Sequence, residues 1–151
     1  MTHRIVIVGG GAGGLELATR LGRRLGRRGK ASITLVDRSL VHVWKPLYHE
    51  VAAGTLDSQE DAVTYLAQAY RSDFQFQYGR MEGLDRERKE VLLGPLCDDH
   101  GREIVPASRL PYDTLVIGVG SVSNHFGIPG AAENCLHLDT LTQAEDFHRS
   151  L

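Results

Sequence analysis

The chain has 151 residues, enough for one domain with a sizeable core, and its hydrophobic share of 42% with 24% charged residues is ordinary for a globular protein. Its formal net charge of −2 argues against a nucleic-acid binder, because such proteins normally carry a clear basic excess. The two cysteines, Cys97 and Cys135, stand far apart and outside any Cys-x-x-Cys pair, which argues against a disulfide framework or a zinc site and favours the reducing cytoplasm.

The first predicted element is a strand that runs directly into a glycine-rich turn. Residues 5–8 read Ile-Val-Ile-Val, a pattern typical of a strand buried on both faces, and a helix is expected after the glycines. The spacing G-x-G-x-x-G fits only Gly9, Gly11 and Gly14, since Glu16 occupies the third position of the other register. In such a motif the glycines allow the turn, the approach of backbone amides to a pyrophosphate, and close packing of helix on strand. We therefore predict a dinucleotide site; a glycine-rich turn that binds nothing is the alternative.

An acidic residue ends the next predicted strand, Ser32–Asp37. Asp37 follows Gly14 by 23 residues, close to the spacing at which such sites carry the acceptor for a ribose 2′-hydroxyl. The intervening helix is expected to end at Gly29 after a basic stretch. That stretch suits a solvated helix C-terminus, with binding of an anionic surface as the alternative.

The segment after this strand, residues 38–54, is apolar and aromatic without a clean period, and Pro46 interrupts it. It is either plain core or a wall along which a flat ring lies. A second helix is expected to begin near Ser58, with Asp61 three residues on, and to bury Ala62, Leu66 and Ala69.

Short β segments follow. Alternating apolar and polar residues predict a half-buried strand over residues 74–78. Three more segments, around 80–84, 90–93 and 103–105, are separated by turn residues, and we predict that they pair as a three-stranded antiparallel meander.

A second strand with glycines lies late in the chain. Residues 114–117 read Thr-Leu-Val-Ile and run into Gly118 and Gly120, which indicate a close backbone approach by a ligand or by the first glycine turn. Further on, Thr140 and Gln143 match a capping box, so a helix is expected from about Thr140.

Together, the strand, glycine turn, helix, strand and Asp37 resemble the FAD-binding half of flavoproteins that have two dinucleotide-binding domains. Residues 114–121 are similar to the second motif of that superfamily, although Gly118 and Val119 stand where Ala and Thr are usual. The resemblance implies an α/β, Rossmann-like FAD/NAD(P)-binding domain over residues 1–121, with a parallel sheet, helices and the antiparallel meander. Residues 122–151 would be a connector and the first helix toward a nicotinamide domain that is absent from this chain.

The whole chain resembles more closely the first third of type II NADH dehydrogenases, the single-subunit NADH:quinone oxidoreductases. The matching stretches are Lys45–Tyr48, Val51–Leu56, Leu110–Asp113 and Asn124–Glu133. The resemblance implies that FAD is the cofactor, that NADH gives it a hydride, and that a quinone receives the electrons. It also implies a respiratory enzyme peripheral on the cytoplasmic face of the inner membrane, attached through C-terminal segments, and a 151-residue portion that is inactive alone.

The same resemblance assigns residues to the cofactor. The backbone of Gly11, Ala12 and Gly13 would hold the pyrophosphate, with Gly9 allowing the turn and Gly14 the packing of helix on strand. Asp37 would take the ribose hydroxyls, with Arg38 and the Met81 backbone at the adenine. On the flavin side, the implied residues are Lys45 and Pro46 along the isoalloxazine, and Gly118 and Gly120 under the phosphate and ribityl chain. No residue is assigned as a general acid or base, and no metal site is expected.

Other functions stay open. Dithiol-disulfide reductases need a close cysteine pair after the second strand, and residues 38–60 contain none. Sulfide:quinone oxidoreductases share the layout, but Cys135 alone cannot form an intramolecular redox pair. A non-catalytic module that binds NAD or ADP is a further alternative, because Asp37 cannot separate FAD from NAD.

The C-terminal residues 121–151 carry several large apolar side chains. They would either fold back or meet their copies from another molecule, and burial of one such side chain contributes roughly 1.5–3 kcal/mol. We therefore predict a homodimer or higher oligomer formed through this tail.

Overall fold

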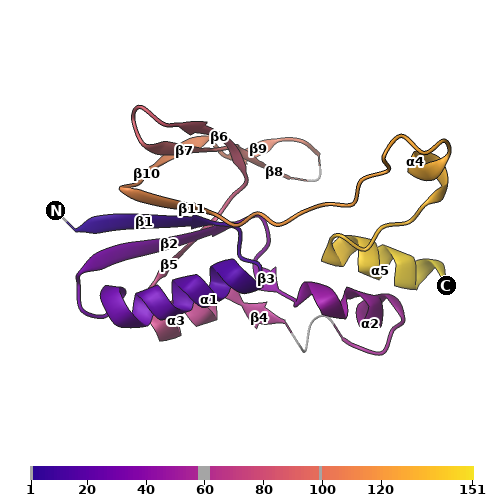
Figure 1. Ribbon diagram of the computed structural model, residues 1–151, viewed down its shortest axis with the longest axis horizontal. Helices are drawn as coiled ribbons and strands as arrows, with labels where there is room; N and C mark the ends of the chain where they lie inside the picture. Colours follow the sequence, from indigo (N-terminus) through magenta and orange to yellow (C-terminus); the bar gives the residue numbers. More distant parts are fainter. Residues whose placement is uncertain (1, 58–61, 99) are drawn as a thin grey trace. The chain divides into compact units, whose positions relative to one another are not determined.

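A computed structural model describes residues 2–57, 62–98 and 100–151 of the chain (Figure 1). The chain forms two compact units, and each is made of two separate segments. Unit 1 comprises Met1–Leu40 and Thr64–Val119, and unit 2 comprises Val41–Val63 and Gly120–Leu151. The expected division after residue 121 remains a prediction; in the structure, the segment before residue 64 groups with the C-terminal residues.

A four-stranded parallel sheet forms the centre of unit 1. Its strands are β1 (His3–Val8), β2 (Ala31–Asp37), β5 (Gln75–Tyr78) and β11 (Thr114–Ile117), in the order β11-β1-β2-β5. Val8 pairs with Ile117 on one side and with Val36 on the other, so these three strands end level with one another. In open parallel sheets this carboxyl edge is where ligands bind.

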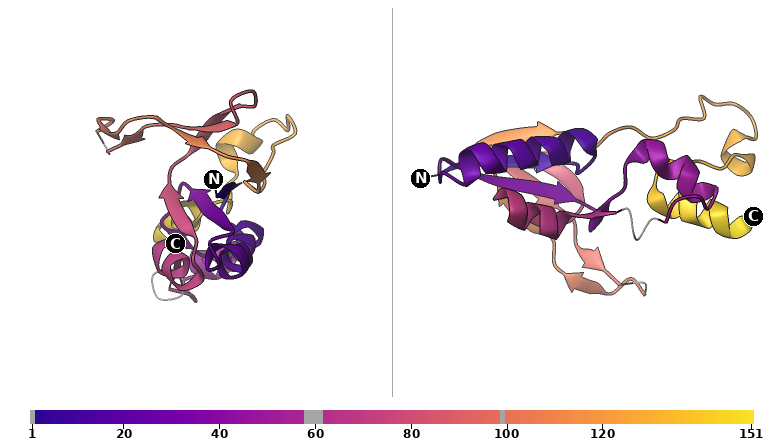
Figure 2. Two further views of the ribbon diagram at one scale, coloured as in Figure 1. Left: turned by 90° about the vertical axis from the view of Figure 1, so that its left-hand side faces the viewer. Right: turned by 90° about the horizontal axis from the view of Figure 1, so that it is seen from below.

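Both faces of this sheet are covered, as predicted for strand 5–8. Ile5 and Ile7 pack beneath helices α1 (Ala12–Leu21) and α3 (Tyr65–Ser72), and α1 continues into the π-helical turn η1 (Gly22–Gly26). The intervening Val6 and Val8 pack on the other face with Val91, Leu93 and Tyr112. Figure 2 shows the two helices together on one side of the sheet. The continuous apolar run therefore reflects burial on both faces.

The second face carries a three-stranded antiparallel sheet in the order β10-β7-β6, made of β6 (Met81–Asp85), β7 (Glu90–Leu93) and β10 (Ser108–Pro111). The prediction that residues 103–105 form its third strand is wrong: Glu103–Val105 is β9 and pairs with β8 (Leu96–Cys97). β10 takes that place because Leu110 opposite Val91 adds to the core, whereas all three residues of β9 are exposed. Pro111 fits there because β10 is an edge strand.

The second helix begins later than expected. Ser58 and Asp61, the expected cap residues, lie outside the described residues, but Val63–Thr64 is the short strand β4 and α3 starts at Tyr65. Its buried face contains Tyr65 and Ala69, one helical turn apart, while Leu66 is 59% exposed. The predicted burial of Leu66 is therefore wrong, because the large aromatic ring of Tyr65 fills the space above the sheet.

Unit 2 contains the short strand β3 (Val41–His42), the 3-10 turn η2 (Lys45–Leu47), and helices α2 (Tyr48–Ala52), α4 (Ala131–Asn134) and α5 (Leu141–Ser150). Its small core consists of Val51, Ala52 and Ala144, where α2 meets α5. α5 opens with the predicted capping box of Thr140 and Gln143. Within the described residues, we find no helix with the length and apolar character needed to cross a membrane.

Candidate functional site

The glycine turn between β1 and α1 is fixed by contacts that leave no room for side chains. Gly9 has a φ of 104°, and its N–H donates to the Val36 carbonyl at 2.8 Å. A Cβ on Gly9 would lie 2.3 Å from the carbonyl oxygen of Gly118, and one on Gly14 would lie 1.8 Å from the carbonyl oxygen of Gly9. The close approach indicated at Gly118 is therefore made by the first glycine turn.

Three of the four residues between Gly9 and Gly14 are exposed, whereas Gly10 is buried. Gly11, Ala12 and Gly13 are exposed, and a Cβ on Gly11 or Gly13 would meet no atom within 4 Å. No side chain caps α1, and its first turn carries no acidic residue. The first N–H groups of a helix lack intrahelical acceptors, and the helix dipole adds partial positive charge there. This end of α1 is suited to a phosphate group.

Asp37 lies directly beside the turn. Its Oδ2 accepts the N–H of Gly10 at 2.6 Å, and its Oδ1 accepts the N–H of Ser39 at 2.8 Å. The Asp37 carbonyl accepts the N–H of Gly79 at 2.9 Å, and β6 with Met81 follows two residues later. The structure thus brings the turn, Asp37 and the chain leading into Met81 to one edge of the sheet, with Arg38 exposed next to them.

Two residues of this site were missed in the sequence. The hydroxyl of Tyr65 donates to the Gly10 carbonyl at 2.7 Å, and a Cβ on Gly10 would lie 2.4 Å from that hydroxyl. Tyr65 also stacks on Phe76, with ring centroids 4.9 Å apart. One signal could have pointed to this contact: Gly10 is a glycine that the G-x-G-x-x-G pattern does not require.

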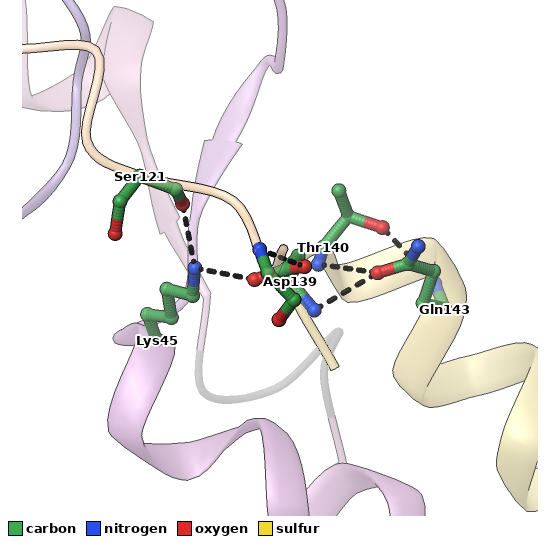
Figure 3. Close-up of polar contacts among 6 residues, drawn as sticks. Lys45, Ser121, Asp139, Thr140 and Gln143 are labelled. Atoms are coloured by element: carbon green, nitrogen blue, oxygen red, sulfur yellow. Dashed lines mark hydrogen bonds and ion pairs between the residues drawn. The ribbon is translucent and has the colours of Figure 1, made fainter. Parts of the chain in front are cut away.

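Lys45, Pro46 and Gly120 belong to unit 2 and are described there by themselves. The Lys45 Nζ donates to the Ser121 carbonyl and forms an ion pair with Asp139 Oδ1, both at 3.0 Å (Figure 3). Asp139 was not identified in the sequence, because it lies 94 residues from Lys45 and outside any motif. Pro46 lies in the exposed turn η2 beside Lys45.

Asp139 is held from three directions. Its Oδ2 accepts the N–H of Ser123 at 2.8 Å, its Oδ1 meets Lys45, and its own N–H donates to Gln143 Oε1 at 2.9 Å. The Ser123 amide and the Lys45 ammonium lower the pKa of Asp139 to about 2, so this carboxylate is charged at neutral pH. Gln143 of the capping box thus accepts the N–H groups of both Thr140 and Asp139, and Asp139 in turn pairs with Lys45 (Figure 3).

The described residues contain one close pair of histidine rings, His125 and His137, with centroids 4.8 Å apart. Across residues 2–57, 62–98 and 100–151, no three or more His, Cys, Asp and Glu side chains are arranged to hold a metal ion. Cys97 and Cys135 are both free thiols on the surface.

Comparisons with known proteins agree on the family. Residues 3–151 match the family described as pyridine nucleotide-disulphide oxidoreductase. The chain is 48% identical over 147 residues to a type II NADH:quinone oxidoreductase of Haemophilus influenzae, covering 97% of this chain and 33% of that protein. It is 32% identical to the NADH dehydrogenase-like protein YutJ of Bacillus subtilis, covering 98% of this chain and 38% of that protein. The chain thus spans about a third of the length of these curated relatives.

Solved structures share the fold. NDH2 from Plasmodium falciparum superposes with a TM-score of 0.79 at 19% identity, covering 99% of this chain and 28% of that one. The sulfide:quinone oxidoreductase of Aquifex aeolicus gives a TM-score of 0.74 at 23% identity, covering 99% and 31%. At these identities the likeness shows the fold alone. The predicted Rossmann-like architecture and the resemblance to the type II enzymes are confirmed.

Proposed function

Since the chain belongs to the pyridine nucleotide-disulphide oxidoreductase family, we propose that it binds FAD and belongs to an enzyme that passes electrons from NADH to a quinone. The observation that carries the proposal is the open glycine turn, which no side chain caps and which is hydrogen-bonded to the Asp37 carboxylate. The 48% identity to a type II NADH:quinone oxidoreductase supports the choice of electron donor and acceptor.

The residues of unit 1 fit the adenosine diphosphate half of such a cofactor. The exposed amides of Gly11, Ala12 and Gly13 would hold the pyrophosphate at the start of α1. Asp37 already accepts two backbone N–H groups, and its carboxylate oxygens have further lone pairs for ribose hydroxyls. Arg38 and Met81 would lie at the adenine, and Gly9, Gly14 and Gly118 keep the backbone close enough to form the site.

Lys45, Pro46 and Gly120, taken by themselves, would contact the flavin, as the resemblance to the type II enzymes implies. When bound, the flavin supplies the hydride acceptor, while the protein supplies orientation and electrostatics. Lys45 keeps its ammonium beside Asp139 rather than free in solvent, so its position is restrained before any ligand arrives. We assign no general acid or base.

The proposal is tested first by the purified protein, which should be yellow and should bind FAD in a fluorescence titration. Gly11→Val should abolish binding, because its side chain would fill the open space in front of the turn. Asp37→Ala should weaken FAD binding by about 1.5–3 kcal/mol, the contribution of hydrogen bonds to a charged group. Retained affinity in both variants would contradict the proposal.

Glu87→Ala is the matched control for Asp37→Ala, since it removes an exposed carboxylate of unit 1 that lies in the turn between β6 and β7. It should leave FAD affinity unchanged. Strong binding of NAD or ADP with no binding of FAD would favour a non-catalytic dinucleotide module.

We further propose that the tail forms a homodimer or higher oligomer, and that the whole enzyme is peripheral on the cytoplasmic face of the inner membrane. Exposed apolar side chains support the first part: Phe126 is 83%, Ile128 62% and Leu136 73% exposed. Light scattering coupled to size exclusion tests it, and a monomer of 16.6 kDa at micromolar concentration would contradict it.

A further inference from the structure

The carbonyl of Gly10 is the acceptor of a fully buried tyrosine. Tyr65 is 2% exposed, and its hydroxyl donates to the Gly10 oxygen at 2.7 Å. A buried tyrosine hydroxyl needs such a partner, because water cannot replace it. On the other side of the same residue, the Gly10 N–H donates to Asp37 Oδ2 at 2.6 Å. Both polar backbone groups of Gly10 are therefore fixed by protein.

These two hydrogen bonds restrain the backbone of Gly10. Glycine has the widest choice of backbone conformations. Gly10 must nevertheless be glycine, since a Cβ there would lie 2.4 Å from the hydroxyl and 2.5 Å from the Cζ of Tyr65. The extra glycine therefore lets the tyrosine approach, and the tyrosine then removes the freedom that the glycine introduces.

The restraint passes to the next residue through the peptide plane. The described peptide bonds are all trans, so the Gly10 carbonyl and the Gly11 N–H point in opposite directions within one plane. Fixing the carbonyl on Tyr65 therefore fixes the Gly11 N–H on the opposite side. Gly11 itself is exposed, and a Cβ added to it would meet no atom within 4 Å.

We propose that Tyr65 is a positioning residue that orients the Gly11 amide for a diphosphate, and that Gly10 is glycine in order to admit it. This inference rests on the proposed function, because it assigns the diphosphate of the cofactor to that amide. Tyr65 touches no ligand itself; it acts through the Gly10–Gly11 peptide. A donor that is already oriented does not lose freedom when its ligand binds, and this raises affinity.

The test compares ligands that share adenosine but differ in phosphate. Tyr65→Phe keeps the ring on Phe76 and removes only the hydroxyl. Calorimetric titration should show that the affinity for ADP and for FAD falls about tenfold, as expected when a hydrogen bond to a charged group is impaired. Binding of adenosine, which reaches Asp37 but carries no phosphate, should stay unchanged in a ligand-observed NMR titration.

Tyr70→Phe is the matched control, because Tyr70 lies on the same helix and is 90% exposed. It should change neither affinity. Gly10→Ala is the second variant: its Cβ would push the ring and the peptide apart, and it should show the same selective loss of ADP binding. Circular dichroism of each variant reports whether the fold is intact.

The outcomes separate this inference from the function on which it rests. A native protein that binds neither ADP nor FAD would overturn the proposed function and the inference with it. A native protein that binds ADP, together with a Tyr65→Phe variant that binds ADP equally well, would overturn the inference alone. Equal losses for ADP and adenosine would also overturn it, because they would indicate general loosening rather than an oriented amide.

Discussion

The two units hold their proposed ligand-binding groups in different ways. In unit 1 the proposed groups are backbone amides of the glycine turn, which is held by the sheet, by Asp37 and by the buried Tyr65. In unit 2 the corresponding group is the side chain of Lys45, which is 48% exposed and is held by Asp139 and one carbonyl. A backbone amide keeps its direction as long as the sheet is folded, whereas a flexible side chain depends on its partner.

The core of unit 1 is also larger than that of unit 2. Unit 1 has two clusters, one on each face of its parallel sheet, and they include Ile7, Leu35 and Val36 with no exposed surface. The unit 2 cluster has three buried residues, Val51, Ala52 and Ala144, none of them large. Because burial of apolar surface is the main source of stability, unit 1 should resist unfolding more strongly than unit 2.

The largest expected effect is at the glycine turn. Gly14→Ala should lower the free energy of unfolding by about 3 kcal/mol, because its Cβ would overlap the Gly9 carbonyl and push α1 from the sheet. The neighbouring Gly13→Ala meets no atom and lies in the same helix, so it should raise stability by about 0.5–1 kcal/mol. Urea denaturation measures the free energy of unfolding of both variants. If both substitutions changed it in the same direction, the turn would not be packed as described.

The second effect is in unit 2. Ala144→Leu adds volume to a fully buried site between α2 and α5 and should destabilise this unit by about 2 kcal/mol. Hydrogen exchange should become faster in α2 and α5 while β1 and β2 keep their rates. Ala132→Leu in α4, on an exposed position, is the control. Equal acceleration in both units would show that they unfold together.

The smallest effect is the acid response of the Lys45–Asp139 pair. In the folded protein the pKa of Asp139 is lowered to about 2 from its ordinary value of 3.8. The contribution of its carboxylate to stability is therefore complete above pH 3.8 and is lost as the pH falls toward 2. Asp139→Asn should remove this part of the pH dependence of stability. The measurement is hydrogen exchange of residues 121–123 as the pH is lowered, compared between the variant and the wild type. Glu133→Gln, an exposed acid of the same unit, should leave the difference intact. An identical acid profile in wild type and Asp139→Asn would contradict the pairing.

Features that depend on residues close together in the chain could be predicted from the sequence. The strand at 5–8, the turn through Gly14 and the capping box at Thr140 all depend on contacts within a few positions, and the structure contains each of them. The position of Asp37 beside the glycine turn was also predictable from the sequence. The parallel strands β1 and β2 are neighbours that end level with each other, so their carboxyl ends lie together. Local geometry of this kind is fixed by residue type and spacing.

The sequence by itself therefore determined the fold class and the glycine turn between β1 and α1. Tertiary structure alone decided which strand completes the antiparallel sheet, where α3 begins, and the two contacts Tyr65–Gly10 and Lys45–Asp139. The partners in those contacts are 55 and 94 residues apart. Such pairs leave no periodic pattern along the chain, because the path of the intervening chain, rather than the spacing of residues, brings the partners into contact.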